Sequence, residues 1–396
     1  MIKLTFLGDM MCCKGQNESF RCGDKFDFSP IFTEVKALLE KSDLVFANIE
    51  TPLTKDYSDL TDDLTKFNTP IEFAQAVKAS GVNVVTVANN HCLDRGVAGI
   101  YSTINCLEEL HLQYVGLNKN GVKKDLIIST PNGMKIGILG YTYGTNYHYN
   151  HIKLSKKNYS LINLFQKQEL SYLFDRFLLK GKTNLRIRKI FFWAKKHFDR
   201  YNWNEYERPE KNRKQLLELK KDIRTLKRQN VDIIIMLSHL GGQFRLEPTP
   251  YNLKMTQFLK KKGVNIVATS HEHLVQKTEK NFYENFAVAY CLGNFCGTFG
   301  ITEWTQKELM CNYSIAWHVY LDTDENKGTI TKTTYSVLKS VVNEKKQIIT
   351  VPCNILYNRL DTVEKNNLVK DVAEISMRFC GKNISTNEGI KEEYEY

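Results

Sequence analysis

The chain has 396 residues, of which 42% are hydrophobic and 25% charged, and its formal net charge at pH 7 is +11. This composition predicts a folded globular protein and excludes an extensively disordered chain. No window approaches the ~18 uninterrupted apolar residues of a membrane span, and a predicted strand starting at Ile2 leaves no room for a signal peptide. The ten cysteines include no CxxC pair and are expected to be reduced thiols. Together these features predict a cytoplasmic protein.

The first 140 residues are predicted to alternate strands and helices. Runs such as IKLTFLGD and VNVVTVANNH are short, β-branched and nearly continuous, which is typical of strands buried on both faces. Intervening segments with apolar residues near helical spacing predict helices. The predicted strands cover residues 2–7, 44–47, 84–88 and 134–139, and the predicted helices cover residues 31–39, 71–79 and 98–110.

The second half continues this pattern and then becomes β-rich. Two further helices are predicted to lead into the runs VDIIIMLSH and VNIVATSHEH, and later segments alternate apolar and polar residues as strands do. The expected fold is therefore an α/β sandwich of two mixed β-sheets flanked by helices, in one domain over residues 1–396. The predicted helices are 211–229, 252–262 and 363–379, the predicted strands are 287–292, 313–322, 328–338 and 346–351, and an acidic tail over 385–396 is expected to be frayed.

Polar side chains stand where five of the buried strands end. In open α/β sheets, ligands bind beyond the carboxyl ends of the strands, so these side chains are expected to converge. Carboxylate, amide and imidazole groups form the ligand set that zinc, manganese and iron prefer. Any one of these residues is weak evidence, but four of the nine histidines occupy such positions, two of them as His271-x-His273. The residues are Asp9, Glu50, Asn90, His91, His239, His271 and His273.

Six blocks in one order resemble the CapA-type proteins of capsule and poly-γ-glutamate synthesis, which belong to the calcineurin-like metallophosphoesterase superfamily. The most specific blocks are ANNHCLDRG at 88–96 and YCLGNF at 290–295. The resemblance covers residues 1–140 and 210–300. The remaining blocks are FLGDMM at 6–11, NIETPLT at 48–54, LSHLGG at 237–242 and TSHEHLVQ at 269–276.

The resemblance implies a metallophosphoesterase-like fold and a role for each aligned residue. It implies one or two divalent ions, manganese, iron or zinc, bridged by Glu50. His91 would be the general acid and Asp94 would orient its ring. Asn294 would contact the substrate. From its position after Asp94, Arg95 is a candidate clamp for a phosphate or carboxylate, and the alternative is an ordinary surface arginine. The implied metal ligands are Asp9, Glu50, Asn90, His239, His271 and His273.

The first block departs from the wider superfamily, where Asp-x-His is usual. This chain has Met11 at the place of that histidine, so one metal would lack an imidazole ligand. The usual Gly-His-x-His becomes Ser270-His271-Glu272-His273, which keeps the ligands and changes the first residue of the loop.

A basic segment without family blocks separates the two parts of the chain that carry them. Residues 151–230 contain 22 Lys and Arg against 8 Asp and Glu. Residues 146–208 are predicted to form an amphipathic helical insertion, because cations alternate with Phe, Leu and Trp. Three interpretations compete: a lid over the active site, a dock on an anionic membrane or on a polymer-synthesis partner, and a nucleic-acid surface, which no motif supports.

These features favour a divalent-metal-dependent phosphoesterase of capsule or poly-γ-glutamate biosynthesis, acting on a phosphoester or anionic polymer. It would be cytoplasmic and could be peripheral at the inner face of the membrane. The alternatives are a non-hydrolytic accessory subunit of polymer synthesis or export, and an intracellular phosphodiesterase or nuclease. A cluster of buried polar residues is costly, which favours chemistry over a scaffold.

Overall fold

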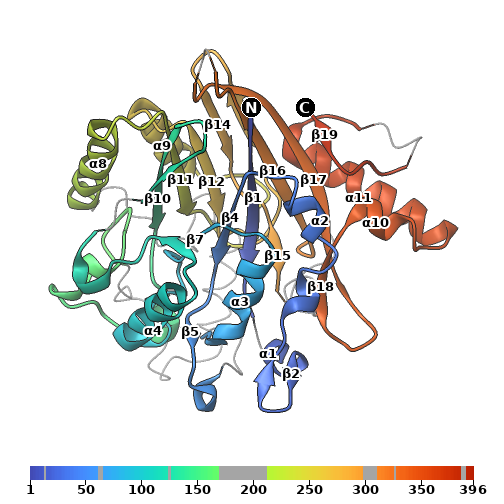
Figure 1. The fold of residues 1–396 in the computed structure, drawn as a ribbon, viewed down its shortest axis with the longest axis horizontal. Coiled ribbons are helices and arrows are strands. Elements are labelled where there is room, and N and C mark those ends of the chain that lie inside the picture. The colour runs from blue at the N-terminus through green and yellow to red at the C-terminus, as the bar shows by residue number, and fades with distance from the viewer. Residues whose placement is uncertain are drawn as a thin grey trace, which may run out of the picture.

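The computed structural model describes residues 1–12, 15–60, 66–123, 126–168, 212–297, 310–324, 327–384 and 389–396. Its framework is two β-sheets packed face to face with helices on their outer faces, as Figure 1 shows. The expected α/β sandwich of two mixed sheets is confirmed.

The larger sheet has nine strands in the order β18-β17-β16-β1-β4-β7-β8, with β15 paired to β1 and β19 to β17. Its middle strands β1, β4 and β7 are mutually parallel, whereas β16 joins β1 in antiparallel register. The strands are β1 (Ile2–Met10), β4 (Leu44–Ile49), β7 (Val84–Thr86), β8 (Gln113–Val115), β15 (Asn294–Cys296), β16 (Tyr313–Leu321), β17 (Ile330–Val342), β18 (Ile348–Pro352) and β19 (Tyr394–Glu395).

The smaller sheet has six strands in the order β13-β14-β12-β11-β10-β9. Strands β10, β11, β12 and β14 are parallel, and β9 and β13 are antiparallel edges. The strands are β9 (Leu126–Ser129), β10 (Lys135–Thr142), β11 (Ile233–His239), β12 (Ile266–Ser270), β13 (Thr278–Asn281) and β14 (Phe286–Ala289). Two small ribbons pair β2 (Arg21–Cys22) with β3 (Lys25–Phe26), and β5 (Leu53–Thr54) with β6 (Thr69–Pro70).

Alternate residues of each strand face different hydrophobic layers, which explains the nearly continuous apolar runs. In β4, Phe46 points into the layer between the sheets, whereas Val45 and Ala47 point into the layer under the outer helices. The inner layer also contains Ile235 from β11 and Ile266 from β12. Burial on both faces fixes the register of these strands, and with it the positions of the residues that follow them.

The helices cover the outer faces of both sheets. The predicted helix over residues 31–39 is instead a 3₁₀ turn followed by one short α-helix. Figure 1 shows α8 and α9 beside β10 and β11, and α10 and α11 near β17. The helical elements are α1 (Gln16–Ser19), η1 (Ser29–Ile31), α2 (Lys36–Leu39), η2 (Tyr57–Asp59), α3 (Ile71–Ala79), α4 (Gly96–Glu109), η3 (Lys119–Gly121), α5 (Tyr147–Asn150), η4 (Asn158–Leu161), α8 (Arg213–Arg228), α9 (Pro250–Lys261), α10 (Cys353–Tyr357) and α11 (Thr362–Cys380).

The acidic tail differs from the prediction. Residues 389–396 are not frayed, because β19 pairs with β17 and Tyr394 stacks on Tyr335 with ring centroids 5.5 Å apart. The hydroxyl of Tyr396 also accepts a hydrogen bond from the indole N–H of Trp317. The prediction rested on the acidic residues and overlooked the two tyrosines, whose burial stabilises the ordered conformation.

Only the first part of the basic insertion predicted over 146–208 is described. Residues 146–168 pack into the domain through two short helical turns and two β-bridges, Leu117 with Ile162 and Thr142 with Leu164. Phe165 is fully buried in the layer under α8. The predicted amphipathic helix falls on residues 169–208, which lie outside the described residues. Among the helices that are described, none has the length and apolar character needed to cross a bilayer.

Candidate metal centre

The carboxyl ends of the parallel strands in both sheets meet at one place. Asp9 is the penultimate residue of β1, and Glu50 directly follows β4. His239 is the last residue of β11, and His271 directly follows β12. All of these side chains are buried, and those of Asp9, Glu50 and His239 are 0% exposed. The prediction that separate strand ends converge therefore holds for this group.

Five of the predicted ligands form two groups of three that share one carboxylate. Glu50, His239 and His271 form one group, and Asp9, Glu50 and His273 form the other, with the ligand atoms within each group no more than 4.8 Å apart. Oε1 of Glu50 lies 3.5 Å from Nε2 of His239 and 3.9 Å from Nε2 of His273. Glu50 thus stands where a carboxylate could bind two cations at once, which is the position that the family resemblance implies for it.

Asn90 lies at the edge of the first group. Its Oδ1 is 2.8 Å from Nε2 of His239, a separation at which both atoms could bind the same cation. Its Nδ2 donates to Oδ1 of Asn146 at 2.9 Å, which fixes the direction of the amide. The geometry is compatible with the predicted ligand role of Asn90, and Asn146 is the residue that orients it.

The chemistry of the donor atoms fits a divalent metal. Burial, followed by the charges of the neighbouring histidines, holds the pKa of His239 and of His271 well below the ordinary value for histidine. Both rings are therefore neutral at pH 7, as metal ligation requires. Nδ1 of His271 is buried and has no hydrogen-bond partner among the described residues. Such an orphaned lone pair is costly unless a ligand satisfies it.

Neighbouring amides and hydroxyls hold the ligands in place. Asn48 donates to Oδ1 of Asp9 at 2.7 Å, and the hydroxyl of Ser270 lies 2.9 Å from Nδ1 of His239. The sequence interpretation missed both residues, although Asn48 opens the block NIETPLT and Ser270 directly precedes His271. Their proximity in sequence to predicted ligands was the available signal.

Asn294 has a different position from the one expected of a substrate-binding residue. Its Oδ1 lies 2.9 Å from Nδ1 of His273, and its Nδ2 donates to the backbone carbonyls of His273 and Cys311. Because the amide nitrogen is committed to carbonyls, Oδ1 must accept the proton of Nδ1, which leaves the Nε2 lone pair of His273 toward Glu50. With both amide atoms occupied, Asn294 orients His273.

The loop that carries His271 and His273 has an unusual backbone. Both residues have positive φ values, 115° and 59°. Such conformations cost roughly 1–3 kcal/mol for a non-glycine residue and cluster at functional sites. The loop is held by Asp9, whose Oδ2 accepts from the backbone N–H of His271 at 3.2 Å, and the strain is consistent with a site shaped for a ligand.

His91 and Asp94 form the predicted pair beside the two ligand groups. Nδ1 of His91 lies 2.6 Å from Oδ2 of Asp94, and the same carboxylate oxygen accepts from the backbone N–H of Phe67 at 2.8 Å. The imidazole also stacks on the ring of Phe67, with centroids 3.9 Å apart. Nδ2 of Asn146 is 3.3 Å from Nε2 of His91 and therefore joins this pair to Asn90. The ring is fixed on several sides.

Arg95 lies in a less buried position. Its Nε is 2.8 Å from Oδ2 of Asp59, and the side chains of the two residues are 20% and 63% exposed. An exposed ion pair of this kind contributes little stability. Arg95 could exchange Asp59 for an anionic substrate, and its predicted role as a substrate clamp stays a prediction.

The chain matches the family described as bacterial capsule synthesis protein PGA_cap over residues 3–298. It belongs to this family. It is 24% identical over 319 residues to the capsule biosynthesis protein CapA of Bacillus anthracis, covering 79% of this chain and 64% of the relative. It is 23% identical over 319 residues to the PGA biosynthesis protein CapA of Bacillus subtilis, covering 80% and 68%. The match thus spans about two thirds of the length of these relatives.

Solved structures resemble this PGA_cap member only remotely. A hypothetical protein from Thermus thermophilus has a TM-score of 0.38 at 11% identity, covering 89% of this chain and 98% of that one. The sulfate thiohydrolase SoxB of Thermus thermophilus has a TM-score of 0.41 at 10% identity, covering 94% and 60%. The family assignment therefore rests on the sequence match, and the site rests on its own geometry.

Proposed function

We propose that this PGA_cap member is a divalent-metal-dependent hydrolase of phosphoester bonds that acts in the biosynthesis of a capsule or of poly-γ-glutamate. The observation that carries the proposal is the pair of buried ligand groups joined at Glu50, with the His91–Asp94 pair beside them. Two cations held a few Å apart would polarise a phosphoryl group and supply a hydroxide nucleophile at neutral pH.

The candidate ligands fall into two sets, one for each of the two cations. Asp9 and His273 would hold one cation, and His239, His271 and Asn90 would hold the other, with Glu50 common to both. Manganese, iron and zinc all accept this mixture of carboxylate, amide and imidazole. Because Met11 stands where the wider superfamily has a histidine, the first position has fewer imidazole ligands than the second.

His91 is suited to give a proton to the leaving group. Its Nδ1 lies 2.6 Å from Oδ2 of Asp94, which accepts the hydrogen bond of that nitrogen and orients the ring. Nε2 is then the atom that can donate to a departing alkoxide. Stacking on Phe67 and the contact of Nδ1 with Asp94 keep the ring from rotating away.

The test is hydrolysis of a broad panel of phosphomonoesters and phosphodiesters by purified protein, with added manganese and after chelation. We expect turnover that the chelator abolishes and that His91→Ala reduces by about 10²-fold or more, at unchanged metal content. His111→Asn is the matched control, because His111 is exposed and asparagine tolerates its positive φ.

Absence of metal-dependent turnover on this panel would count against the hydrolase proposal. If the unchanged protein shows no metal-dependent turnover on the panel, while His91→Ala still fails to support polymer production in cells, the hydrolase proposal is wrong. A non-hydrolytic accessory role in polymer synthesis or export would then be the better explanation.

A further inference from the structure

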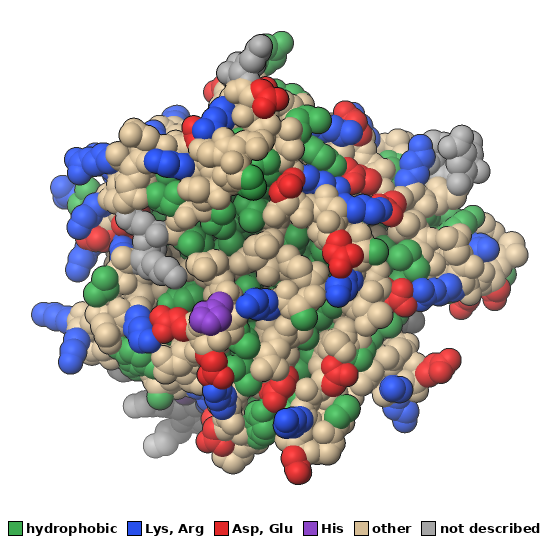
Figure 2. All heavy atoms as spheres, viewed as in Figure 1, with side chains coloured by type: hydrophobic (Ala, Val, Ile, Leu, Met, Phe, Trp, Pro, Cys, Tyr) green, Lys and Arg blue, Asp and Glu red, His purple; other side chains and the backbone are tan. Residues whose placement is uncertain are grey.

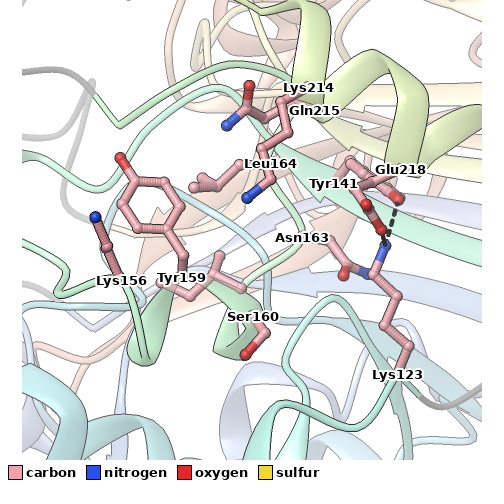
Figure 3. Close-up of a pocket in the computed structure, with 11 residues that line it drawn as sticks. Lys123, Tyr141, Lys156, Tyr159, Ser160, Asn163, Leu164, Lys214, Gln215 and Glu218 are labelled. Carbon is pink, nitrogen blue, oxygen red and sulfur yellow. Dashed lines mark hydrogen bonds and ion pairs between the residues drawn. The ribbon is translucent and has the colours of Figure 1, made fainter.

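A cavity separate from the candidate metal centre lies between the segment that follows α5 and the start of α8. Its volume is about 240 Å³, and Figure 3 shows side chains from both segments around it. It shares no residue with the metal centre. The lining residues are Lys123, Tyr141, Lys156, Tyr159, Ser160, Ile162, Asn163, Leu164, Lys214, Gln215 and Glu218.

The three lysines of this cavity differ in their electrostatic environment. Lys123 is neutralised, because its ammonium lies 2.6 Å from Oδ2 of Asp222, with Glu218 at 3.9 Å. The hydroxyl of Tyr141 also donates to Asp222. Lys156 and Lys214 are exposed, and no acid in the described part of the chain forms an ion pair with either. Among the described residues, the three lysines outnumber the two acids beside them, Asp222 and Glu218, so the cavity carries a net positive charge.

Lys156 and Lys214 lie on opposite walls of the cavity. Lys156 precedes η4, and Lys214 lies in the first turn of α8. Figure 3 shows them on different sides of the cavity, with Gln215 and Tyr159 nearby. Figure 2 shows further Lys and Arg side chains over the region of α8. An anion in the cavity would lie between the two segments that carry these ammonium groups.

The remaining lining limits the size and character of a ligand. Ile162 and Leu164 form an apolar wall, and Ser160 and Gln215 add a hydroxyl and an amide. Pockets for drug-sized ligands are usually about 300–1,000 Å³, so this one suits a smaller molecule. Lysine binds multivalent oxyanions as a point charge, and two lysines favour a ligand with at least two anionic oxygens.

We propose that this cavity is a binding site for a small multivalent oxyanion, either a phosphate compound or a polycarboxylate. The proposal goes beyond the hydrolase function and does not depend on it. The two sites are nevertheless connected. Asn163, in the cavity wall, accepts a backbone hydrogen bond from Thr142, and the next residue, Tyr143, packs on the ring of His271 with centroids 4.6 Å apart.

The experiment measures anion binding to the full chain after chelation, so that the metal centre contributes no cation. Isothermal titration at constant ionic strength would use inorganic pyrophosphate as one probe and citrate as the other. We expect saturable binding of at least one probe, weakened by about tenfold or more in the double variant Lys156→Gln, Lys214→Gln. A preference for one probe decides between phosphate and carboxylate.

Two further variants make the result specific. Lys254→Gln with Lys261→Gln removes two exposed charges from α9, away from the cavity lining, and should leave binding within about twofold. Gln215→Glu adds an acid inside the cavity at a partly exposed helical position and should weaken binding without unfolding the protein. If neither probe binds the unchanged protein, or if the α9 double variant loses as much affinity as the cavity double variant, the proposal is wrong.

Discussion

Two buried polar clusters lie on the same strand, β1, and only one of them has the properties of a ligand site. At the carboxyl end, Asp9 belongs to the metal centre. Four residues earlier, the hydroxyl of Thr5 lies 2.7 Å from Nδ1 of His318 on the neighbouring strand β16. Both clusters contain buried histidine, and burial lowers the pKa of that histidine in each. A depressed pKa therefore does not distinguish them.

Hydrogen bonding does distinguish them. Both ring nitrogens of His318 have a partner, since Nε2 lies 3.1 Å from the hydroxyl of Ser336. In the metal centre, Nδ1 of His271 has no partner among the described residues, and its ring faces other ligand atoms. A buried polar group with every bond satisfied stabilises the fold, whereas an unsatisfied ring nitrogen among several other potential ligand atoms fits a metal site.

The largest expected effects, on metal content and on the free energy of unfolding, follow from substituting one histidine in each cluster. His271→Ala should reduce bound metal from about one to two equivalents to background, because one of the ligand groups loses a neutral imidazole. His318→Gln should leave metal content unchanged and lower the free energy of unfolding by about 1–3 kcal/mol, since it disturbs satisfied buried hydrogen bonds. Elemental analysis and urea unfolding of chelated protein measure the two quantities.

The same two variants could show that the two clusters do not differ in role. If His271→Ala kept its metal, or if chelated His271→Ala were destabilised as much as His318→Gln, the two clusters would both be structural. We instead expect chelated His271→Ala to be little changed in stability, because the substitution removes an unsatisfied polar group.

A smaller effect is expected from the residue that orients His91. Asp94→Asn should lower kcat by about 10–100-fold with little change in metal content, because an amide does not orient the His91 imidazole as the carboxylate does. Asp24→Asn is the matched control, since Asp24 is an exposed acid outside the two ligand groups. Equal losses in both variants would show that general charge, and not the orientation of His91, is responsible.

The pH dependence of stability provides the next test. Burial lowers the pKa of His318 from 6.5 to about 3, so the folded state stays neutral while the unfolded chain takes up a proton below pH 6.5. The contribution of His318 to stability should therefore be constant above pH 6.5 and fall from there toward pH 3, by about 1.4 kcal/mol per pH unit at most, or about 2 kcal/mol by pH 5.

The comparison with His318→Gln isolates this contribution. Glutamine does not titrate, so the stability difference between the unchanged protein and the variant should narrow by about 2 kcal/mol between pH 7 and pH 5. The buried histidines of the metal centre act in the same direction in both proteins and cancel in the difference. A gap that stays constant over this range would mean that His318 does not carry the effect.

The sequence predicted the architecture and the convergence of residues that could bind a metal, because both depend on local patterns. Short β-branched runs identified the strands that meet at the site, and their terminal residues identified Asp9, Glu50, His239, His271 and His273. These are positions at which a periodic apolar pattern ends, and such a break is visible without any knowledge of the fold.

The supporting residues could not be predicted in the same way. Asn146 reaches His91 and Asn90 only because the segment after β10 folds back over the site, which is a contact between residues 55 positions apart. The ordered tail likewise depends on the pairing of β19 with β17 across about 60 residues. Long-range contacts of single polar or aromatic side chains leave no periodic pattern in the sequence.

The smallest effect is expected at Arg95, on the more exposed rim of the metal centre. Its ion pair with Asp59 is screened by solvent, so Arg95→Gln should change the free energy of unfolding by less than about 1 kcal/mol. If Arg95 also clamps an anionic substrate, as the sequence predicts, KM should rise several-fold while kcat stays nearly constant, because the lost interaction binds substrate and transition state alike. Lys55→Gln, which breaks an exposed ion pair with Glu109, is the matched control and should change neither constant. An unchanged KM in Arg95→Gln would restrict Arg95 to its partnership with Asp59 and leave substrate binding to the buried groups.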